Sequence, residues 1–479
     1  MFRTERDPLG ERQVPADAYY GIQTIRAVEN FPISGLRQPA PLVTATLLVK
    51  KAAAEANVAI GRLPREVGTA IVRAADDALD GRLGDQFVVD VYQAGAGTSH
   101  NMNVNEVLAN RAGEHLGEAR GTYARVHPND HVNMGQSSND VFPASTRLAL
   151  LLEHDRLRKE ADAVAAALTA RSEEFRTVLK VGRTHLQDAV PITLGQEFSG
   201  YAACVACAAR DLEFAAGHLR ELNLGATAVG TGLNAGPEYT AAVVAHLARY
   251  TGLELRAAEN PFRVTQSMGD ILAYSGAMRR LAVELGKIAS DLRLLGMGPR
   301  AGLAEIALPA VQPGSSIMPG KVNPSMAEMV NQVCFQVVGC DATITAACEA
   351  GQLELNVMTP VIAWNALHAS HILAEAMHAL RVRCLDGLVA DPTRCRELLD
   401  RSTAVATALT PYIGYEATAE LARESLRTGV PVAQLALDRQ LLDAARLAQI
   451  LDPEAMTRPG VAGSAGPAPG PVPPRTPER

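Results

Sequence analysis

Aromatic side chains and long apolar runs are both scarce in this sequence of 479 residues. Phe, Trp and Tyr together make up 4% of the chain, although 47% of the residues are hydrophobic. A core of small and aliphatic side chains favours packed helices over a β-sandwich. No apolar run reaches the length that crosses a membrane, and residues 1–7 lack the apolar segment of a secretory signal. We therefore expect a mainly α, cytoplasmic protein that is large enough for more than one domain.

A basic stripe and a disulfide framework are also missing. Acidic and basic residues are interspersed and give a net charge of −7, which argues against a nucleic-acid partner. The seven cysteines predict free thiols in a reducing compartment. Cys204 and Cys207 have C-x-x-C spacing, but they lie in an Ala-rich helical run with no second pair, and we interpret them as buried structural cysteines. His368, His371 and Glu375 share a helix face without a metalloprotease pattern, and a packed or solvated helix explains them better than a metal site.

Proline and glycine are absent from the longest helical pattern, which runs between Pro143 and Gly182 and predicts a helix of over 30 residues. Comparable helical stretches cover 194–222, 262–296, 325–358 and 360–390. Several of these stretches are apolar around much of their circumference. Such helices must be buried in a large core or against other chains, so we expect a helix bundle and an oligomer.

The two ends of the chain have a different character. Residues 1–40 contain turn signals and predict irregular structure, and helical spacing from 43 to 80 is interrupted at 61–64. Residues 459–479 contain seven prolines and four glycines, which predicts a disordered tail. The expected domains are an N-terminal mostly helical domain at 1–138, a central long-helix bundle at 139–393, a small C-terminal helical domain at 394–457 and the tail at 458–479.

Four polar segments between the helices carry the chemistry. Residues 314–323, GSSIMPGKVN, combine two hydroxyls, an ammonium and an amide in a loop that precedes a helical run. Residues 95–105, 136–140 and 182–191 add further short polar groups and the imidazole of His185. Such donors suit a small dianion and can stabilise negative charge that develops on it. Helix capping alone would also explain the segments at 95–105 and 136–140.

Two further segments are polar or glycine-rich. Residues 225–232, GATAVGTG, lack the Gly-Lys-Ser/Thr ending and the preceding strand of a phosphate loop. We interpret them as a flexible connection that could line the site. Residues 127–131, HPNDH, predict a polar turn.

The string at 314–323 resembles the signature of the aspartase/fumarase superfamily, Gly-Ser-Ser-x-Met-Pro-x-Lys-x-Asn. The other three polar segments are similar to that family as well, and the similarity covers the chain except for its tail. The resemblance implies three mostly helical domains with a long five-helix central bundle, and four chains that form a 20-helix core in a homotetramer. It also implies active sites that draw on three chains and a C4-dicarboxylate substrate. The sequence contains no metal cluster and no dinucleotide fingerprint, so we expect no cofactor and no metal in the site.

The resemblance implies a catalytic role for two residues. Ser315 matches the general base that removes the C3 proton in an anti elimination, and backbone N–H groups of the closed loop would stabilise its alkoxide. His185 and Asn139 match contacts to the leaving group at C2. Glu328 matches a glutamate that the family pairs with the site histidine, where a carboxylate would favour imidazolium.

Eight positions match substrate-binding residues of the family, among them the leaving-group contact Asn139. Those that match the β-carboxylate site, where negative charge develops, are Thr98, Ser137, Ser138 and Ser316. Those that match the α-carboxylate site are Thr184, Lys321 and Asn323. The stretch at 127–131 resembles a second anion site of fumarases, whose presence here the sequence leaves open.

Two activities of the family fit, and both give fumarate through an enediolate: loss of ammonia from L-aspartate and loss of water from L-malate. The stretches that resemble the enzymes acting on aspartate are 19–21, 95–99, 182–191 and 331–335. By contrast, Ser138 replaces a frequent threonine, and Gly320 and residues 413–415 resemble fumarases. We expect ammonia elimination, with hydration as the alternative. A catalytically silent helical scaffold is a more remote alternative, because the residues named above are intact.

Overall fold

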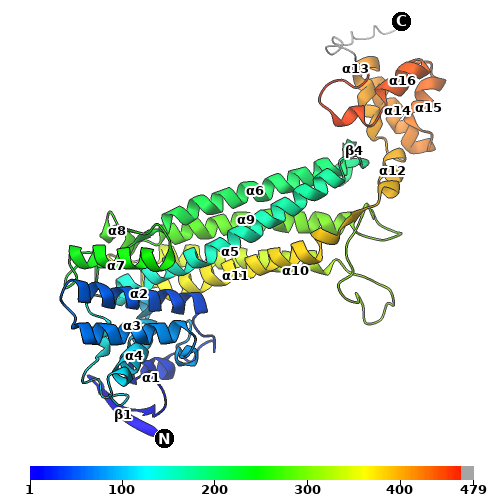
Figure 1. Ribbon diagram of the computed structural model, residues 1–479. Coiled ribbons are helices and arrows are strands. Elements are labelled where there is room, and N and C mark those ends of the chain that lie inside the picture. Colours follow the sequence, from blue (N-terminus) through cyan, green and yellow to red (C-terminus); the bar gives the residue numbers. More distant parts are fainter. Residues whose placement is uncertain (465–479) are drawn as a thin grey trace. The chain divides into compact units, whose positions relative to one another are not determined.

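The computed structural model describes residues 1–464 and is mainly helical (Figure 1). The chain divides into two compact units, each assembled from three segments. The first unit contains Met1–Ala161, Cys207–Glu284 and Gln332–Ala376, and the second contains Asp162–Ala206, Leu285–Asn331 and the chain from Met377 onward. Most of the predicted tail, residues 465–479, lies outside the described residues. No helix in the described part is long and apolar enough to cross a membrane.

The N-terminal part of the first unit starts with a hairpin, so the prediction of irregular structure there was wrong. Strands β1 (Phe2–Asp7) and β2 (Gly10–Pro15) pair antiparallel, and helix α1 (Ile22–Asn30) follows. The Arg3 guanidinium fastens this hairpin by donating to the carbonyls of Pro15, Ala18 and Tyr20 at 2.8–2.9 Å. Such contacts between distant residues cannot be read from local turn signals.

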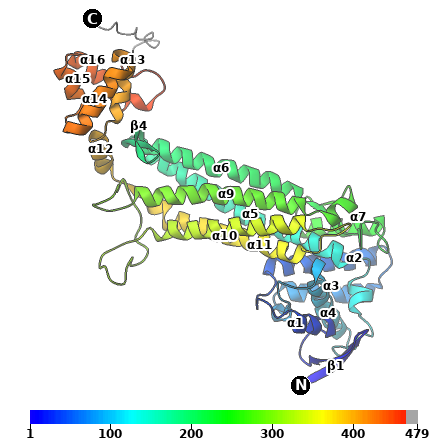
Figure 2. The same cartoon turned by 180° about the vertical axis from the view of Figure 1, so that it is seen from behind.

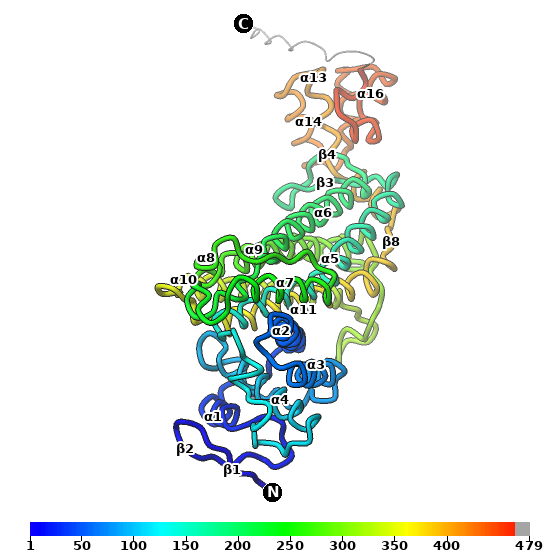
Figure 3. The backbone as a smooth tube through the Cα atoms, turned by 60° about the vertical axis from the view of Figure 1, so that its left-hand side comes forward, coloured from blue at the N-terminus to red at the C-terminus, as the bar shows by residue number. Residues whose placement is uncertain are grey.

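Helices α2 (Ala40–Ala59) and α3 (Arg65–Leu79) confirm the helical pattern with its interruption at 61–64. Helix α4 (Thr98–His115) follows the first polar segment. Helix α2 packs on α3, and α3 packs on α4 (Figure 2, Figure 3). A core of Val, Leu and Ala side chains with the aromatic ring of Phe87 lies between these helices.

The long helices are the ones that the sequence predicts. Their bounds are α5 Ser138–Glu174, α6 Leu194–His218, α9 Gly269–Leu295, α10 Ser325–Glu349 and α11 Thr359–Arg383. Helix α5 spans 37 residues and contains Pro143, whose missing N–H leaves the Asn139 carbonyl without its usual helical partner. In the first unit the shorter helices α7 (Pro237–Thr251) and α8 (Pro261–Gln266) follow the 225–232 segment.

In each unit a polar side-chain contact joins two of the long helices. In the first unit the fully buried guanidinium of Arg147 (α5) donates to both carboxylate oxygens of Asp270 (α9), at 2.6 and 3.2 Å. In the second unit the Tyr201 hydroxyl (α6) donates to Asp291 (α9) at 2.9 Å. Such contacts help to fix the register between neighbouring helices.

The second unit contains a hairpin where the sequence suggested a polar loop. Strands β3 (Leu179–Thr184) and β4 (Gln187–Thr193) pair antiparallel across a two-residue turn. His185 and Leu186 form this turn with φ of 50° and 60°. A two-residue turn with both φ values positive usually carries Asn or Gly, which explains why the sequence did not reveal it.

The small helices predicted after the bundle are present. They are α12 Pro392–Asp400, α13 Thr410–Ile413, α14 Tyr415–Thr428, α15 Val432–Asp438 and α16 Ala444–Ile450. Buried Leu409, Leu421 and Ile450 contribute to the core that α13–α16 share, whereas Leu399 of α12 packs with Val181 of β3 in a separate cluster. The Tyr412 hydroxyl donates to the carbonyl of Ala462 at 2.7 Å and holds the chain beyond α16 against these helices.

Candidate functional site

Two of the predicted polar segments meet in the first unit. Thr98 begins α4 and Ser138 begins α5, and their hydroxyl oxygens lie 3.1 Å apart. This approach depends on Gly97, whose φ is 67° and whose added Cβ would lie 2.0 Å from the Phe142 ring. The segments at 95–105 and 136–140 therefore contribute adjacent hydroxyls, as expected for two walls of one site.

The turn before α5 is fixed by the buried carboxylate of Asp140. Its Oδ1 accepts from the backbone N–H of Ser137 at 2.9 Å. Its Oδ2 accepts from the backbone N–H groups of Gly225 and Thr227 at 3.1 and 3.0 Å. Burial raises the pKa of Asp140 to about 6, although these hydrogen bonds act in the opposite direction. The 225–232 segment is thus anchored to the polar turn by hydrogen bonds.

The side chain of Asn139 lies between the same two segments. Its Nδ2 donates to the carbonyl of Ala228 at 2.8 Å, while Ser138 Oγ is 3.5 Å from its Oδ1. Its own backbone carbonyl accepts from Asn223 Nδ2 at 3.2 Å. This carbonyl lacks the usual helical partner because residue 143, four positions later, is a proline.

A buried cation lies behind the polar turn. Lys50 on α2 is fully buried, and its Nζ donates to Asn133 Oδ1 at 2.8 Å and to Gln136 Oε1 at 2.9 Å. Asn101 and Asn105 on α4 also donate to Asn133 Oδ1. Burial lowers the pKa of Lys50 to about 7, and the charge of the Asp140 carboxyl opposes this shift. The network connects α2 and α4 with the residues that precede Ser137.

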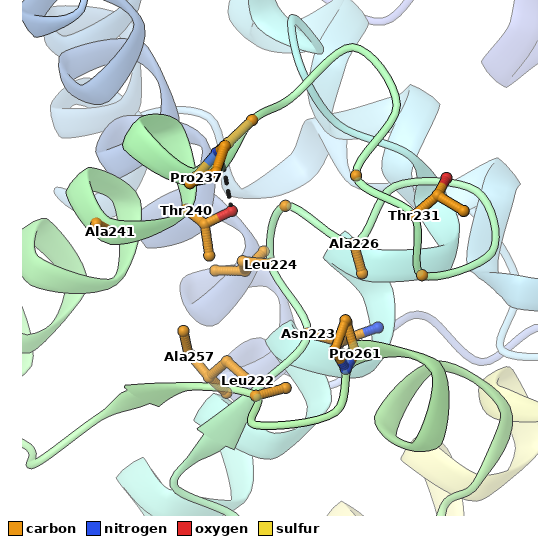
Figure 4. A pocket seen from close by; sticks show the side chains of 15 residues that line it. Leu222, Asn223, Leu224, Ala226, Thr231, Pro237, Thr240, Ala241, Ala257 and Pro261 are labelled. Atoms are coloured by element: carbon orange, nitrogen blue, oxygen red, sulfur yellow. Dashed lines mark hydrogen bonds between the residues drawn. The ribbon is translucent and has the colours of Figure 1, made fainter.

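A cavity of about 340 Å³ lies against the 222–232 segment (Figure 4). Its walls are mainly apolar and include Leu222, Leu224 and Ala226, together with the start of α7 at Pro237. Thr98 and the 137–139 turn are not among its lining residues. The cavity is therefore distinct from the predicted substrate-binding groups.

The signature loop belongs to the second unit and holds Ser315 half-buried. Ser315 Oγ accepts from the backbone N–H of Ile317 at 3.2 Å and of Met318 at 3.0 Å. Two N–H donors at this oxygen favour its deprotonated form, because they stabilise the charge of an alkoxide. Ser316, the next residue, is exposed.

The base of the loop is closed by three hydrogen bonds. Gly314 N donates to the Lys321 carbonyl at 2.8 Å, and Asn323 Nδ2 donates to the Gly314 carbonyl at 2.7 Å. Lys321 Nζ donates to Asn323 Oδ1 at 2.7 Å. A Cβ on Gly314 would lie 2.5 Å from the Lys321 carbonyl oxygen, so glycine is required there. The ammonium and the amide are thus held side by side at the end of the loop.

Thr184 and His185 are exposed at the tip of the β3–β4 hairpin in the second unit. Glu328 is half-buried in the first turn of α10. Within residues 1–464, no hydrogen bond or ion pair joins Glu328 to His185. Four of the predicted site residues therefore lie in the first unit, namely Thr98, Ser137, Ser138 and Asn139. The other seven lie in the second unit.

The residues considered and set aside as metal sites have other contacts. Among residues 1–464, no group of three His, Cys, Asp or Glu side chains could hold a metal ion. The His368 ring stacks on Trp364 with centroids 5.1 Å apart, in agreement with a packed helix.

The prediction of buried cysteines was wrong in part: Cys204 is exposed, and half-buried Cys207 accepts from Arg280 at 3.3 Å.

Sequence reasoning missed three groups that shape these sites. It named Asp140 only as a helix-capping residue, and it assigned nothing to Asn223. It also could not identify the two N–H donors as those of Ile317 and Met318. The one sequence signal was Pro143, which leaves the Asn139 carbonyl in need of a partner.

Comparison with known proteins agrees with this geometry. The family model described as "Lyase" matches residues 10–339, and the model described as "Fumarase C C-terminus" matches residues 405–458. A protein named aspartate ammonia-lyase from a Bacillus species is 50% identical over 96% of this chain and 98% of its own length. Its namesake from Pseudomonas aeruginosa is 50% identical over 95% and 97%, respectively.

Solved structures show the same fold. One described as fumarate lyase:delta crystallin from Brucella melitensis, bound to cobalt, has a TM-score of 0.92 and 52% identity, covering 96% of this chain and all of that one. A class II fumarase from Schistosoma mansoni has a TM-score of 0.94 and 36% identity over the same shares. The chain therefore belongs to the aspartase/fumarase superfamily of lyases.

Proposed function

We propose that this chain is an aspartate ammonia-lyase, a carbon–nitrogen lyase that converts L-aspartate reversibly to fumarate and ammonia. Relatives of that name are 45–50% identical over nearly the whole chain. The structural observation that carries the proposal is the Ser315 hydroxyl with its two backbone N–H donors. A serine so placed can act as a base once the loop has closed over substrate.

In the proposed reaction Ser315 removes a proton from C3 and the ammonium leaves from C2 on the opposite face. The electron pair of the broken C–H bond moves onto the β-carboxylate and gives an enediolate, which collapses to fumarate as the C–N bond breaks. The hydroxyls that would hold this carboxylate are those of Thr98, Ser137, Ser138 and Ser316. Lys321, Asn323 and Thr184 would hold the α-carboxylate, while Asn139 and His185 would contact the leaving amine. Glu328 would support the histidine.

We further propose that the protein is a cytoplasmic homotetramer with active sites that draw on three chains. Large apolar side chains on the long helices support an oligomer: Phe214 is 75% exposed and Phe335 is 72% exposed in the single chain. Exposed aromatic side chains of this kind are typical of surfaces that another chain covers. The division into domains at 1–138, 139–393 and 394–457 stays a prediction.

The alternative function is that of a class II fumarase, favoured by the similarity to the Schistosoma mansoni enzyme. Purified protein given L-aspartate or L-malate in parallel, with fumarate followed by its ultraviolet absorbance, separates the two. Fumarate from L-aspartate alone is the expected result. Fumarate from L-malate alone would establish the hydratase, and no fumarate from either would favour a silent scaffold. Light scattering on the eluting protein measures the oligomeric state.

A further inference from the structure

Four hydrogen bonds fasten the Ser137–Asn139 turn to residues 223–228. Asp140 accepts from the N–H groups of Gly225 and Thr227, Asn139 Nδ2 donates to the Ala228 carbonyl, and the Asn223 amide donates to the Asn139 carbonyl. Asp140 also accepts from the N–H of Ser137 within the turn. The carboxylate is fully buried, so its contacts with Gly225 and Thr227 are shielded from water, whereas the Asn139–Ala228 bond is exposed.

These contacts determine which end of the Asn139 amide is free. The atom 2.8 Å from the Ala228 carbonyl must be the nitrogen, because two oxygens at that distance would repel each other. The amide oxygen is then left with Ser138 Oγ at 3.5 Å, the limit of a hydrogen bond. An amide oxygen accepts hydrogen bonds only, and an ammonium group only donates them. This orientation therefore suits a protonated amine at C2, whereas the reversed amide would repel it.

We propose that Asp140 is a positioning residue that, by locking residues 223–228 onto the Ser137–Asn139 turn, presents the Asn139 amide oxygen to the substrate ammonium. The inference rests on the proposed function and deepens it, since it assigns amine recognition to a buried carboxylate that does not itself touch substrate. The positioning also involves Asn223. Its amide donates to the Asn139 carbonyl, which Pro143 leaves without a helical partner.

The test is a double-mutant cycle with Asp140→Asn and Asn139→Ala. The Asn side chain keeps the shape of Asp but replaces one acceptor oxygen by an NH₂ group, so at least one of the three backbone N–H groups loses its partner. We expect D140N alone to lower kcat/KM for L-aspartate by about tenfold to a hundredfold. In the N139A background D140N should have little further effect, because the group that it positions is gone.

The reverse reaction separates positioning from general damage. With fumarate and ammonia as substrates, D140N should raise KM for ammonia about tenfold and change KM for fumarate by less than about threefold. The matched control is Asp341→Asn, which makes the same change at another buried carboxylate of the first unit, one bonded to Ser275 and Arg279. D341N should leave both KM values unchanged.

Two outcomes would overturn the proposed role of Asp140. Additive effects in the cycle, or equal rises of KM for ammonia and fumarate, would make Asp140 merely structural. If D140N does not fold, Asn223→Ser weakens the same lock from the other side and should show the same non-additivity with N139A. Wild-type protein that makes no fumarate from L-aspartate would instead defeat the proposed function before any variant is compared.

Discussion

The backbone N–H of Met318 donates a hydrogen bond to Ser315 Oγ at 3.0 Å, and that of Ile317 donates a second at 3.2 Å. Both donors belong to the main chain, so they are present whenever the loop has this conformation. Two N–H donors at this oxygen stabilise the alkoxide form of the serine. Loop conformation and basicity are therefore coupled in this protein.

Replacing Ser315 by Ala tests this coupling. The variant should lose on the order of a thousandfold or more in kcat for fumarate formation, because the proton acceptor is removed. The side chain is half-buried in a loop, so the melting temperature should change little. Fumarate absorbance and thermal unfolding measure the two effects.

Ser316→Ala is the matched control for that variant. The neighbouring hydroxyl is exposed and makes no hydrogen bond within residues 1–464. In the proposed site it holds one carboxylate oxygen, so its loss should cost about tenfold to a hundredfold in kcat/KM. Equal rates for wild type and S315A would show that Ser315 is not the base.

Lys321→Met should weaken substrate binding. Lys321 Nζ is held beside Asn323 by a 2.7 Å hydrogen bond and is the one ammonium of the signature loop. Loss of a charged donor to a carboxylate should raise KM for L-aspartate by about tenfold to a hundredfold. Lys321→Arg keeps the charge and should recover part of the loss, whereas Lys159→Met on an exposed helix face should have no effect. Steady-state kinetics on the three variants would contradict the assignment if K321M kept the wild-type KM.

Glu305→Ala should destabilise the β3–β4 hairpin. The Glu305 carboxylate is fully buried and contacts Lys180 Nζ at 3.0 Å and Arg183 Nη1 at 3.0 and 3.1 Å. Its removal leaves Lys180, itself 1% exposed, with only Glu197, so a loss of about 3–5 kcal/mol in the free energy of unfolding is expected. Chemical denaturation at fixed protein concentration measures the loss. A change below about 1 kcal/mol would mean that the hairpin relaxes to solvate the freed charges.

The sequence was sufficient for the long helices, because a run such as 144–181 without proline or glycine has few alternatives. It failed at the two hairpins for different reasons. The first depends on Arg3 reaching carbonyls 12–17 residues away. The second turns at His185 and Leu186, which are not turn-forming residues. Contacts between distant residues and strained turns leave little local pattern.

The candidate site also contains some residues that the sequence reveals and others that it does not. Side chains that would contact substrate, such as Ser315 and Lys321, could be named from the motif, because substrate chemistry dictates their type. The groups that position such side chains could not be named. Asp140, which in our proposal positions Asn139, acts on backbone N–H groups 85 and 87 residues away. A buried carboxylate with three backbone partners has the same local sequence as an ordinary helix cap.

Asp140 and Lys50 also predict a pH dependence. The folded-state pKa of Asp140 is about 6 instead of the ordinary 3.8, so the fold favours its neutral form. Its contribution to stability is fully present below pH 3.8 and is lost as the pH rises through 6. For Lys50, whose pKa is lowered to about 7, the contribution is present above pH 10.5 and is lost as the pH falls through 7. Tyr239, also buried near Asp140, stays neutral throughout because burial and the Asp140 charge raise its pKa.

Between pH 4 and 6.5 the difference in unfolding free energy between wild type and D140N should therefore change by about 2 kcal/mol, to the disadvantage of wild type at the higher pH. The difference reports Asp140 together with its effect on Lys50, because the Asp140 charge raises the pKa of Lys50 and is missing in D140N. Activity should follow the opposite trend and fall below about pH 6, since the neutral carboxyl binds the three backbone N–H groups less strongly than the carboxylate does. Urea denaturation of both proteins across this range, with kcat/KM measured alongside, tests both statements. A wild-type minus D140N difference that is constant with pH would show that the Asp140 carboxyl does not titrate there.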